Sequence, residues 1–331
     1  MLHTVFSRPL SISKVENISK KSVTWLTVDE SGAGQRIDNF LLRHLKGVPK
    51  SHIYRILRSG EVRVDSKRVD ATHRLQMAEV LRIPPVRTGE RPETAQAAIP
   101  NAARLANRIL YQDEALIVLN KPAGMAVHGG SGVSRGVIEQ LRQEFPDVKF
   151  LELAHRLDRE TSGVLLVAKK RAALVELHRA MREGDMDKRY LVLVKGKWQN
   201  ARQSVKLPLL KHTAIDGDRR VSVDPQGQAA HTIFNLRKSW NEFSLLEAEL
   251  KTGRTHQIRV HLAHLGFPIA GDDKYGDYPL NKELQKRGLK RMFLHAYSIT
   301  IRHPLSGEPL RLEAPLPEEL GNFLNKLDEH A

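Results

Sequence analysis

The hydrophobic pattern of the chain changes near its first third. Within residues 34–85, the apolar side chains of 37–45 recur at the spacing of one helix face. A second apolar face follows Ser51, the expected N-terminal cap, and ends at Gly60. Two runs in which apolar and polar residues alternate are expected to be short strands: 62–64 and 80–83. This pattern predicts a small unit of two helices and a sheet.

From Ile109 onward, apolar runs of strand length alternate irregularly with helical segments. The expected strands are 116–119, 164–167, 190–194, 243–249 and 293–301. The expected helices are 136–145, 172–182 and 255–265. Because strands and helices do not alternate regularly, the pattern favours an α+β fold with a mixed, largely antiparallel central sheet.

A proline-rich segment separates these two regions. It carries Pro84, Pro85, Pro92 and Pro100 and few large apolar residues, which is typical of a semi-extended linker. A chain of 331 residues is also long enough for about two domains. The expected division is an N-terminal tail, a first domain, a linker and a second domain: 1–22, 23–85, 86–107 and 108–331.

The composition narrows the class of partner. Lys and Arg number 53 against 38 Asp and Glu, and the net charge of +15 favours a polyanion, most often nucleic acid. A hydrophobic content of 40% is enough for a core, and the absence of Cys excludes disulfides and thiolate zinc sites. No apolar run reaches the ~18 residues of a membrane span, and the N-terminus lacks a signal-peptide pattern. We therefore expect a cytoplasmic protein.

Basic residues cluster on the polar faces of the first unit. We expect these side chains to contact RNA phosphates: Arg36, Lys50, Arg55, Arg58, Arg63 and Lys67. Such contacts supply affinity and register rather than sequence choice. The segments 34–41 and 49–64 resemble an S4 RNA-binding domain; a generic basic helical hairpin is the alternative.

The segment 155–163 is the strongest candidate for chemistry. Asp158 lies between Arg156 and Arg159, just before the apolar run 164–168. Neighbouring guanidinium groups favour the charged form of a carboxylate, and a loop beside a buried strand is a common place for a reactive group. A structural ion pair on a tight turn is the alternative.

Two further residues are candidates for the same site. Tyr190 begins an expected strand, where its ring could stack on a base or relay a proton, or could be an ordinary strand aromatic. Arg259 lies in the first turns of an expected helix and could lock Asp158 by a bidentate pair. The segment 119–128 is expected to be mainly a structural hairpin: a strand, a Pro-Gly turn and a second short strand.

The histidines do not predict a metal site. His256, His261 and His264 lack the His-Glu-x-x-His arrangement, and the chain has no Cys. They are expected to contact phosphate or to make local hydrogen bonds.

Taken together, these segments resemble the RluA-type pseudouridine synthases, from Gly34 to the C-terminus. The most specific matches are 155–163 and 253–261. The family commonly has Asp where this chain has Glu160, which puts only a secondary interaction in doubt. The resemblance implies isomerisation of uridine to pseudouridine in RNA without metal, nucleotide or redox cofactor.

The resemblance also implies roles for particular residues. Asp158 is the essential acid, either as nucleophile at C1′ or by removing a ribose proton. Arg259 holds Asp158, and Tyr190 stacks on the uracil and assists proton removal at C5. The residues expected to line the substrate pocket are Leu294, Arg156 and His155.

The expected partner is 23S rRNA or a pre-50S ribosomal particle, modified by a monomer at several uridines in and near the peptidyl-transferase region. Three alternatives remain: a tRNA-directed sister synthase, a non-catalytic S4-type rRNA-binding assembly factor, and a glycosidase. The last usually needs two cooperating carboxylates, and only one acid lies in a reactive context here.

Overall fold

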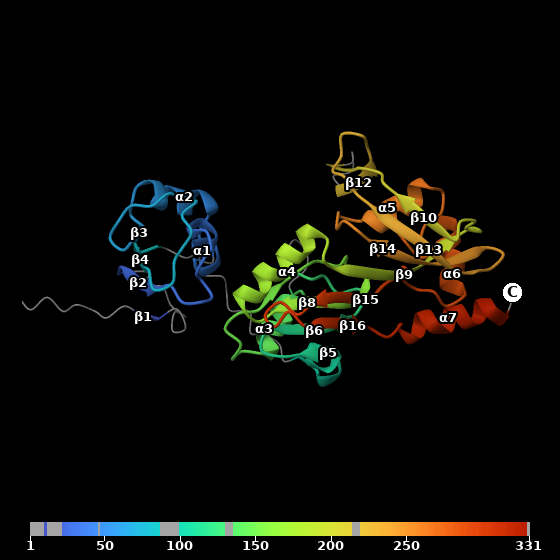
Figure 1. Cartoon of the computed structure of the whole chain (residues 1–331), viewed down its shortest axis with the longest axis horizontal. Coiled ribbons are helices and arrows are strands. Elements are labelled where there is room, and N and C mark those ends of the chain that lie inside the picture. Colours follow the sequence, from blue (N-terminus) through green and yellow to red (C-terminus); the bar gives the residue numbers. More distant parts are fainter. Residues whose placement is uncertain are drawn as a thin grey trace, which may run out of the picture. The chain divides into compact units, whose positions relative to one another are not determined.

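The computed structural model of the chain describes six segments: 10–11, 22–45, 47–86, 99–129, 135–213 and 219–329. The chain divides between Ile99 and Pro100 into two compact units, which Figure 1 shows in the colours of the sequence. Each unit has its own cluster of buried apolar side chains. Most of the predicted N-terminal tail and of the predicted linker lies outside the described residues.

The first unit combines two helices with a small sheet, as predicted. Its helices are α1 (Ile37–His44) and α2 (Lys50–Arg58). Its sheet has the order β1 (Leu10–Ser11), β2 (Thr24–Thr27), β4 (Val80–Ile83), β3 (Arg63–Val64). The apolar face of each helix is buried, with Phe40 and Ile53 both 0% exposed. The sequence pattern missed β2.

The expected cap of α2 is wrong by two residues. Pro49 is the N-cap, no side chain caps the helix there, and Ser51 lies within its first turn. Proline has a fixed φ that suits the entry to a helix, so the chain turns in at Pro49 without a hydroxyl cap.

The second unit is built on a ten-stranded mixed sheet. Its main path runs β10 (Arg202–Val205), β13 (Thr232–Ser239), β14 (Phe243–Leu250), β9 (Asp187–Lys195), β15 (Leu294–Arg302), β8 (Ser162–Ala168), β6 (Leu116–Lys121), β5 (Ile109–Gln112). Off this path, β16 (Pro309–Glu313) pairs with β15, and β7 (Glu152–Leu153) pairs with β8. β8 and β15 run parallel, while the other pairings are antiparallel. The predicted α+β class and the largely antiparallel sheet are confirmed.

Helices and a hairpin complete the second unit. They are α3 (Val137–Glu144), α4 (Arg171–Glu183), α5 (Gln257–His264), α6 (Tyr278–Lys286), α7 (Glu318–Glu329) and the pair β11 (Leu209–Thr213) and β12 (Arg219–Val223). The predicted helices correspond to α3, α4 and α5.

Strand β8 is buried on both faces, which explains its uninterrupted apolar sequence. Leu165 and Val167 pack into the cluster that contains α3, whereas Val164 and Leu166 pack into the cluster that contains α4. Figure 1 shows α3 and α4 beside this part of the sheet. A strand covered on both sides has no solvent-facing positions, so its sequence does not alternate. The loop that precedes β8 is therefore anchored to the middle of the core.

The predicted hairpin over 119–128 is only half correct. After β6 the chain turns at Gly124, but the next residues form no strand. The carbonyls of Ala126 and Val127 instead accept hydrogen bonds from the backbone N–H groups of Val137 and Ile138. These bonds satisfy the first turn of α3, whose N–H groups have no partner within the helix.

The residues after Pro100 pack on the second unit. Two short 3₁₀ turns, Asn101–Ala103 and Leu105–Arg108, lead into β5. Leu105 is buried in the core, and Glu144 of α3 accepts hydrogen bonds from the backbone of Leu105 and Ala106 at 2.9 and 2.7 Å.

Replacing Gly163 by Ala should destabilise the protein strongly. Its φ is +113°, and an added Cβ would lie 2.1 Å from the carbonyl oxygen of Ala296 in the parallel strand β15. Backbone strain and this clash should together lower the free energy of unfolding by about 3 kcal/mol or more, measured by chemical denaturation.

Gly184→Ala is the matched control. Gly184 also has a positive φ, +81°, but nothing lies within 4 Å of an added Cβ. Gly184→Ala should lower the free energy of unfolding by about 1 kcal/mol, because only the left-handed backbone conformation is strained. Equal losses in the two variants would show that the approach of β8 to β15 is not close.

Candidate active site

Asp158 lies in the loop between β7 and β8, where four of the predicted residues meet. Its Oδ2 is 3.2 Å from Nη1 of Arg259, and its side chain is 27% exposed. A pocket of about 90 Å³ is lined by Asp158, Tyr190, Arg259 and Leu294, with Arg156 at the same pocket. The predicted proximity of Asp158 to Arg259 and Tyr190 is therefore present in the structure.

Two cations fasten the backbone of this loop. The ammonium of Lys121, fully buried at the end of β6, donates to the carbonyls of Pro122, Met125 and Arg159 at 2.8, 2.8 and 3.0 Å. Burial lowers the pKa of Lys121 to about 7. From the other side, Arg291 donates to the carbonyl of Glu160 at 3.1 Å. Asp158 is thus positioned through its neighbours' carbonyls, which leaves its own oxygens available.

Arg259 is itself held by an acid that the sequence did not reveal. Its Nε and Nη2 each donate to one carboxylate oxygen of Asp272 at 2.7 Å, and only Nη1 reaches Asp158. The bidentate pair expected with Asp158 is therefore wrong; that geometry belongs to Asp272. Fork-to-carboxylate pairing fixes the plane of the guanidinium, so the remaining N–H group points at Asp158.

The charges of this group are stabilised mutually. Burial opposes the charge of Arg259, but its hydrogen bonds and the charges of Asp272 and Asp158 outweigh burial and raise its pKa. Burial would raise the pKa of Asp272, yet its hydrogen bonds to Arg259 leave that pKa below the usual value. Asp272 is 1% exposed. The buried guanidinium of Arg259 therefore forms ion pairs with two carboxylates, those of Asp272 and Asp158.

His256 borders Asp158 from the N-terminus of α5. It has a left-handed backbone conformation with φ +55°, which is uncommon for a residue other than glycine. Its Nε2 lies 3.9 Å from Oδ1 of Asp158, and its Nδ1 is 2.8 Å from the hydroxyl of Tyr275. Burial lowers the pKa of His256 despite the nearby charge of Asp158. The ring is thus a neutral neighbour of the carboxylate at neutral pH.

Of the other predicted histidines, His264 is exposed, whereas His261 has a structural environment. His261 is fully buried, with Nε2 2.9 Å from the carbonyl of Leu207 and Nδ1 3.0 Å from Oγ1 of Thr232. Across the described part of the chain, no group of three or more His, Asp or Glu side chains is arranged to hold a metal ion.

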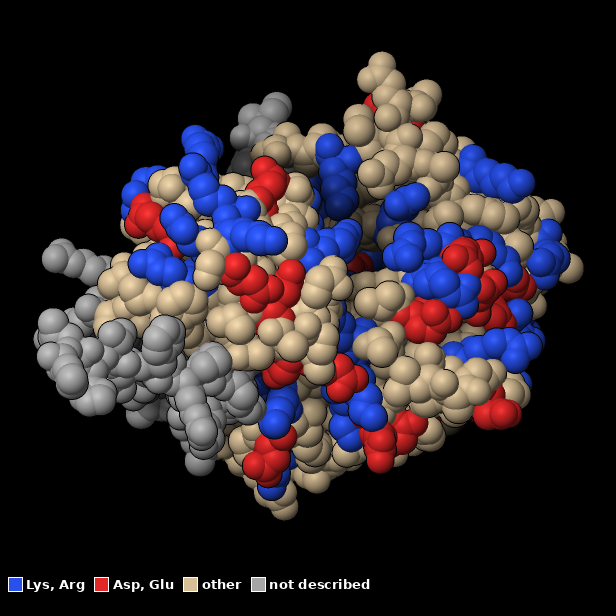
Figure 2. All heavy atoms as spheres, turned by 60° about the vertical axis from the view of Figure 1, so that its left-hand side comes forward, with Lys and Arg blue, Asp and Glu red and all other residues tan. Residues whose placement is uncertain are grey.

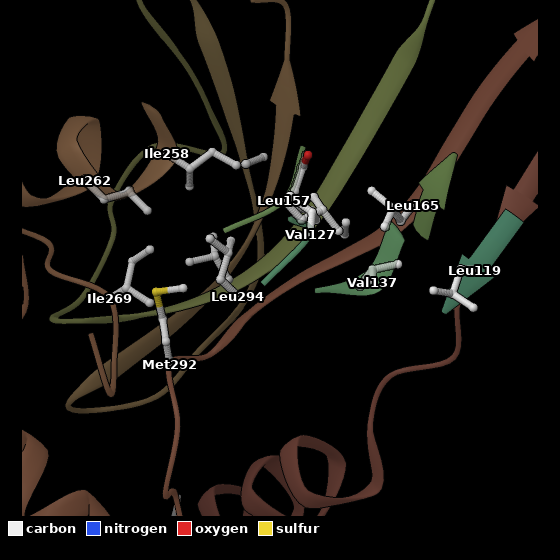
Figure 3. Close-up of a cluster of buried hydrophobic side chains, with 14 of the residues drawn as sticks. Leu119, Val127, Val137, Leu157, Leu165, Ile258, Leu262, Ile269, Met292 and Leu294 are labelled. Atoms are coloured by element: carbon white, nitrogen blue, oxygen red, sulfur yellow. The ribbon is translucent and has the colours of Figure 1, made fainter. Parts of the chain in front are cut away.

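Tyr190 lies within β9 rather than at its edge, and it is 7% exposed. Burial and the charge of Asp158 raise its pKa, so the phenol is protonated at neutral pH. Leu294 begins β15 and faces the pocket from the hydrophobic side. Figure 3 shows Leu157, Ile258 and Leu294 within the buried apolar cluster, and all three also line the pocket.

His155 and Arg156 have different positions. Nε2 of His155 accepts a hydrogen bond from the backbone of Leu166 at 3.1 Å, and burial lowers the pKa of His155 to about 4. His155 lines a neighbouring cavity rather than the pocket itself, whereas exposed Arg156 lines both. Arg159 donates to the carbonyl of Gly124 at 3.0 Å and lies 3.6 Å from the carboxylate of Glu160.

The predicted RNA-contacting cations of the first unit fall into two groups. Arg36 is held by Asp38 through two hydrogen bonds of 2.7 and 3.2 Å, and Arg55 pairs with the half-buried Glu61 at 3.0 Å. Figure 2 shows that Asp and Glu side chains lie among the Lys and Arg of the face in view. Because several cations are paired with acidic residues, the formal net charge overstates the positive charge that is available to bind a polyanion.

The remaining cations are more accessible. Lys50, Arg58 and Lys67 are exposed, and none has an acidic partner among the residues the structure describes. Exposed Arg63 uses its guanidinium on the carbonyls of Gly60 and Ser66, both at 3.3 Å. In the described segments, no helix is long and apolar enough to span a bilayer.

Asp272→Asn should destabilise the second unit. The variant keeps the shape of the side chain but removes the charge that neutralises buried Arg259. Removing one partner of a buried ion pair costs about 3 kcal/mol of unfolding free energy, measurable by denaturant titration.

Asp277→Asn is the control. Asp277 caps α6 through the N–H of Leu280 and pairs with the exposed Lys195. Because Asn is an equally good N-cap and exposed pairs contribute little, the loss should stay below about 1 kcal/mol. A loss for Asp272→Asn no larger than this would contradict the role given to Asp272.

Comparison with protein families finds two matches in this chain. The family described as RNA pseudouridylate synthase matches residues 115–264, which include the loop of Asp158 and all of α5. The S4 domain family matches residues 35–81, within the first unit.

Curated relatives match almost the whole chain. The ribosomal large subunit pseudouridine synthase C of Pasteurella multocida is 51% identical over 317 residues, covering 96% of this chain and 97% of that protein. The protein of the same name from Escherichia coli K12 is 52% identical, covering 95% of this chain and 98% of that one.

A solved structure agrees with the fold of the second unit. Human RNA pseudouridylate synthase domain containing 4 has a TM-score of 0.56 and 28% identity, over 68% of this chain and 94% of that one. With the pocket around Asp158 and the two family matches, these similarities show that the chain belongs to the RNA pseudouridylate synthase family, as an RNA-modifying enzyme that also carries an S4 domain.

Proposed function

We propose that this enzyme converts uridines of 23S rRNA to pseudouridine, with free rRNA or a pre-50S particle as its substrate. The proposal is supported by its similarity to synthases named for the ribosomal large subunit. The observation that carries the chemistry is a single carboxylate, Asp158, in a partly open pocket beside Arg259, Tyr190 and Leu294.

The reaction breaks the N1–C1′ bond of a uridine, rotates the uracil and rejoins it through C5. Asp158 acts at the ribose, either by attacking C1′ or by removing a ribose proton, and both routes need a carboxylate with an unshared oxygen. Arg259 contacts Oδ2 only, and Oδ1 has the neutral ring of His256 as its neighbour at 3.9 Å, so Oδ1 is the oxygen that we propose reacts.

The pocket does not suit a glycosidase. Such enzymes use two carboxyl groups about 5–10 Å apart that flank the scissile bond. Asp158 is the single acid among the residues that line this pocket, and Asp272 is buried behind Arg259 with both of its oxygens occupied. The geometry therefore favours retention and reattachment of the base over its release by hydrolysis.

Tyr190 and Leu294 line the pocket, which supports the proposal that they hold the detached base. The raised pKa of Tyr190, caused first by burial, keeps it a neutral phenol. We propose that its ring stacks on the uracil and that its hydroxyl oxygen accepts the C5 proton while its own proton passes to solvent water, so that the phenol is neutral before and after the step. Leu294 packs against the base from the apolar side, and Arg156 and His155 border the entrance.

The target nucleotide has to leave its stack to reach Asp158. Extrusion costs a few kcal/mol, and the cost is lowest in loops and incompletely folded RNA. This favours loop or junction uridines in immature rRNA. That several of them lie in and near the peptidyl-transferase region of 23S rRNA is proposed from the resemblance to the large-subunit synthases, and the extrusion cost does not select that region. A monomer acting in the cytoplasm, without a metal or other cofactor, is sufficient for this scheme.

Asp158→Asn should abolish pseudouridine formation while RNA binding stays nearly intact. The amide can neither attack C1′ nor accept a ribose proton. Turnover is measured by tritium release from 23S rRNA, and binding by filter retention. Asp147→Asn, at an exposed residue outside the pocket, should retain wild-type activity. Turnover by Asp158→Asn would refute the catalytic assignment.

Mapping pseudouridine in total rRNA and tRNA, with and without this protein, tests the substrate. Sites lost only from tRNA would favour a tRNA-directed synthase. An unchanged map would favour an assembly factor that only binds rRNA.

The free cations of the first unit should set the salt dependence of binding. Replacing Lys50, Arg58 and Lys67 together by Gln should reduce the slope of log affinity against log salt by about 2, since each phosphate contact contributes ~0.7–0.9. The control replaces three exposed lysines of the second unit, Lys282, Lys286 and Lys290, by Gln. An equal effect in both variants would show that total charge, rather than this surface, drives binding.

A further inference from the structure

A second cavity opens beside the catalytic pocket. Its volume is about 510 Å³, and it shares Asp158, Tyr190, Gly253 and further lining residues with the smaller pocket. Ligand pockets typically measure about 300–1,000 Å³, so a pocket of about 90 Å³ cannot hold a whole nucleotide. A nucleotide whose base and ribose reach Asp158 must therefore extend into the adjoining cavity, and an RNA strand continues there as phosphate.

The adjoining cavity is strongly basic. Arg156, Arg182, Lys188 and Arg254 line it, and its one acid is Asp158, which is already in contact with Arg259. For Arg156, Arg182 and Lys188, the described residues offer no carboxylate within ion-pairing distance. This contrasts with the paired cations elsewhere, such as Arg36 with Asp38.

Lys188 is the least solvated of these cations. It lies two residues before Tyr190 in β9, and side chains two apart share one face of a strand. Between them, Arg189 points to the other face, where it pairs with buried Glu247 at 2.6 Å. Lys188 therefore shares the face of Tyr190, in the part of the cavity that His155 also lines.

The folded protein does little to stabilise the charged form of Lys188. Burial lowers its pKa, and no neighbouring carboxylate offsets this effect. Lys188 is half-buried, so its ammonium loses part of its hydration without gaining an acidic partner among the described residues, and an anion in the cavity would offset that cost. An unpaired lysine of this kind is typical of a binding site rather than of a structural contact.

We propose that this cavity binds a backbone phosphate of the RNA strand whose uridine enters the pocket, with Lys188 as the main contact and Arg182 and Arg156 at its rim. This inference rests on the proposed RNA substrate and adds how the second unit binds the backbone of that RNA strand. Arg182 belongs to the last turn of α4, so the phosphate is held between β9 and α4.

The test compares Lys188→Gln and Lys188→Arg with the wild-type protein, using a 23S rRNA transcript at several salt concentrations. Lys188→Gln should weaken binding about tenfold, because hydrogen bonds to charged groups contribute about 1.5–3 kcal/mol. It should also lower the salt slope by about 0.7, the value for one phosphate of a single strand. Lys188→Arg should retain most of the affinity and the slope.

Thermal unfolding separates this role from a structural one. Because Lys188 is unpaired and desolvated, Lys188→Gln should leave the melting temperature unchanged or raise it. Arg182→Gln, at an exposed residue, gives a second measurement that cannot depend on core folding, and it should lower the slope similarly. Lys282→Gln, an equal charge change on α6 outside the cavity, should leave affinity and slope nearly unchanged.

Wild-type affinity and slope in both Lys188→Gln and Arg182→Gln would overturn the proposal. Effects no larger than that of Lys282→Gln would do so as well. A wild-type protein that binds the transcript but makes no pseudouridine in it would contradict the proposed function instead. The comparison of slopes would still stand, because it measures binding and needs no turnover.

Discussion

The site depends on a guanidinium shared by two carboxylates. Asp272 occupies two N–H groups of Arg259 and balances its charge inside the protein, and a third N–H group is left for Asp158. One cation with two anions leaves a net negative charge, and it resides at the partly exposed carboxylate. Arg259 thus contacts Asp158 without being neutralised by it alone, which suits the role that we propose for Asp158 at the ribose.

The backbone around Asp158 is also held without using the carboxylate of Asp158. Lys121 and Arg291 bind carbonyl groups of the loop and of its neighbours, and Gly163 lets β8 approach β15. These contacts come from β6 and from the segment that enters β15, the two strands that flank β8 in the sheet. The position of the reactive side chain is therefore a property of the sheet, and its own atoms need not be used to hold it.

Charge is distributed in a way that the net value of +15 conceals. Many cations are paired within the protein, as Arg36 is with Asp38 and Arg189 with Glu247. Exposed cations without an acidic partner in the described segments include Lys50, Arg58 and Lys67 of the first unit, and further cations without one line the cavity beside Asp158. The first set suits contacts with a polyanion, and the second suits the RNA strand that we propose is modified.

The sequence by itself determined the helices α1 to α5, the strands β6, β8, β9, β14 and β15, the α+β class and the candidacy of Asp158. It missed the eight-residue strand β13. Hydrophobic periodicity and short motifs involve residues close together in the sequence, so they can be recognised without coordinates. Only the tertiary structure showed that Asp272 takes the bidentate pair, that His256 borders Asp158, and that Lys121 binds a loop 38 residues away. Asp158 and Arg259 themselves are 101 residues apart. Such contacts follow from the order of strands in the sheet, and no local pattern encodes that order, because many pairings bury the same apolar faces.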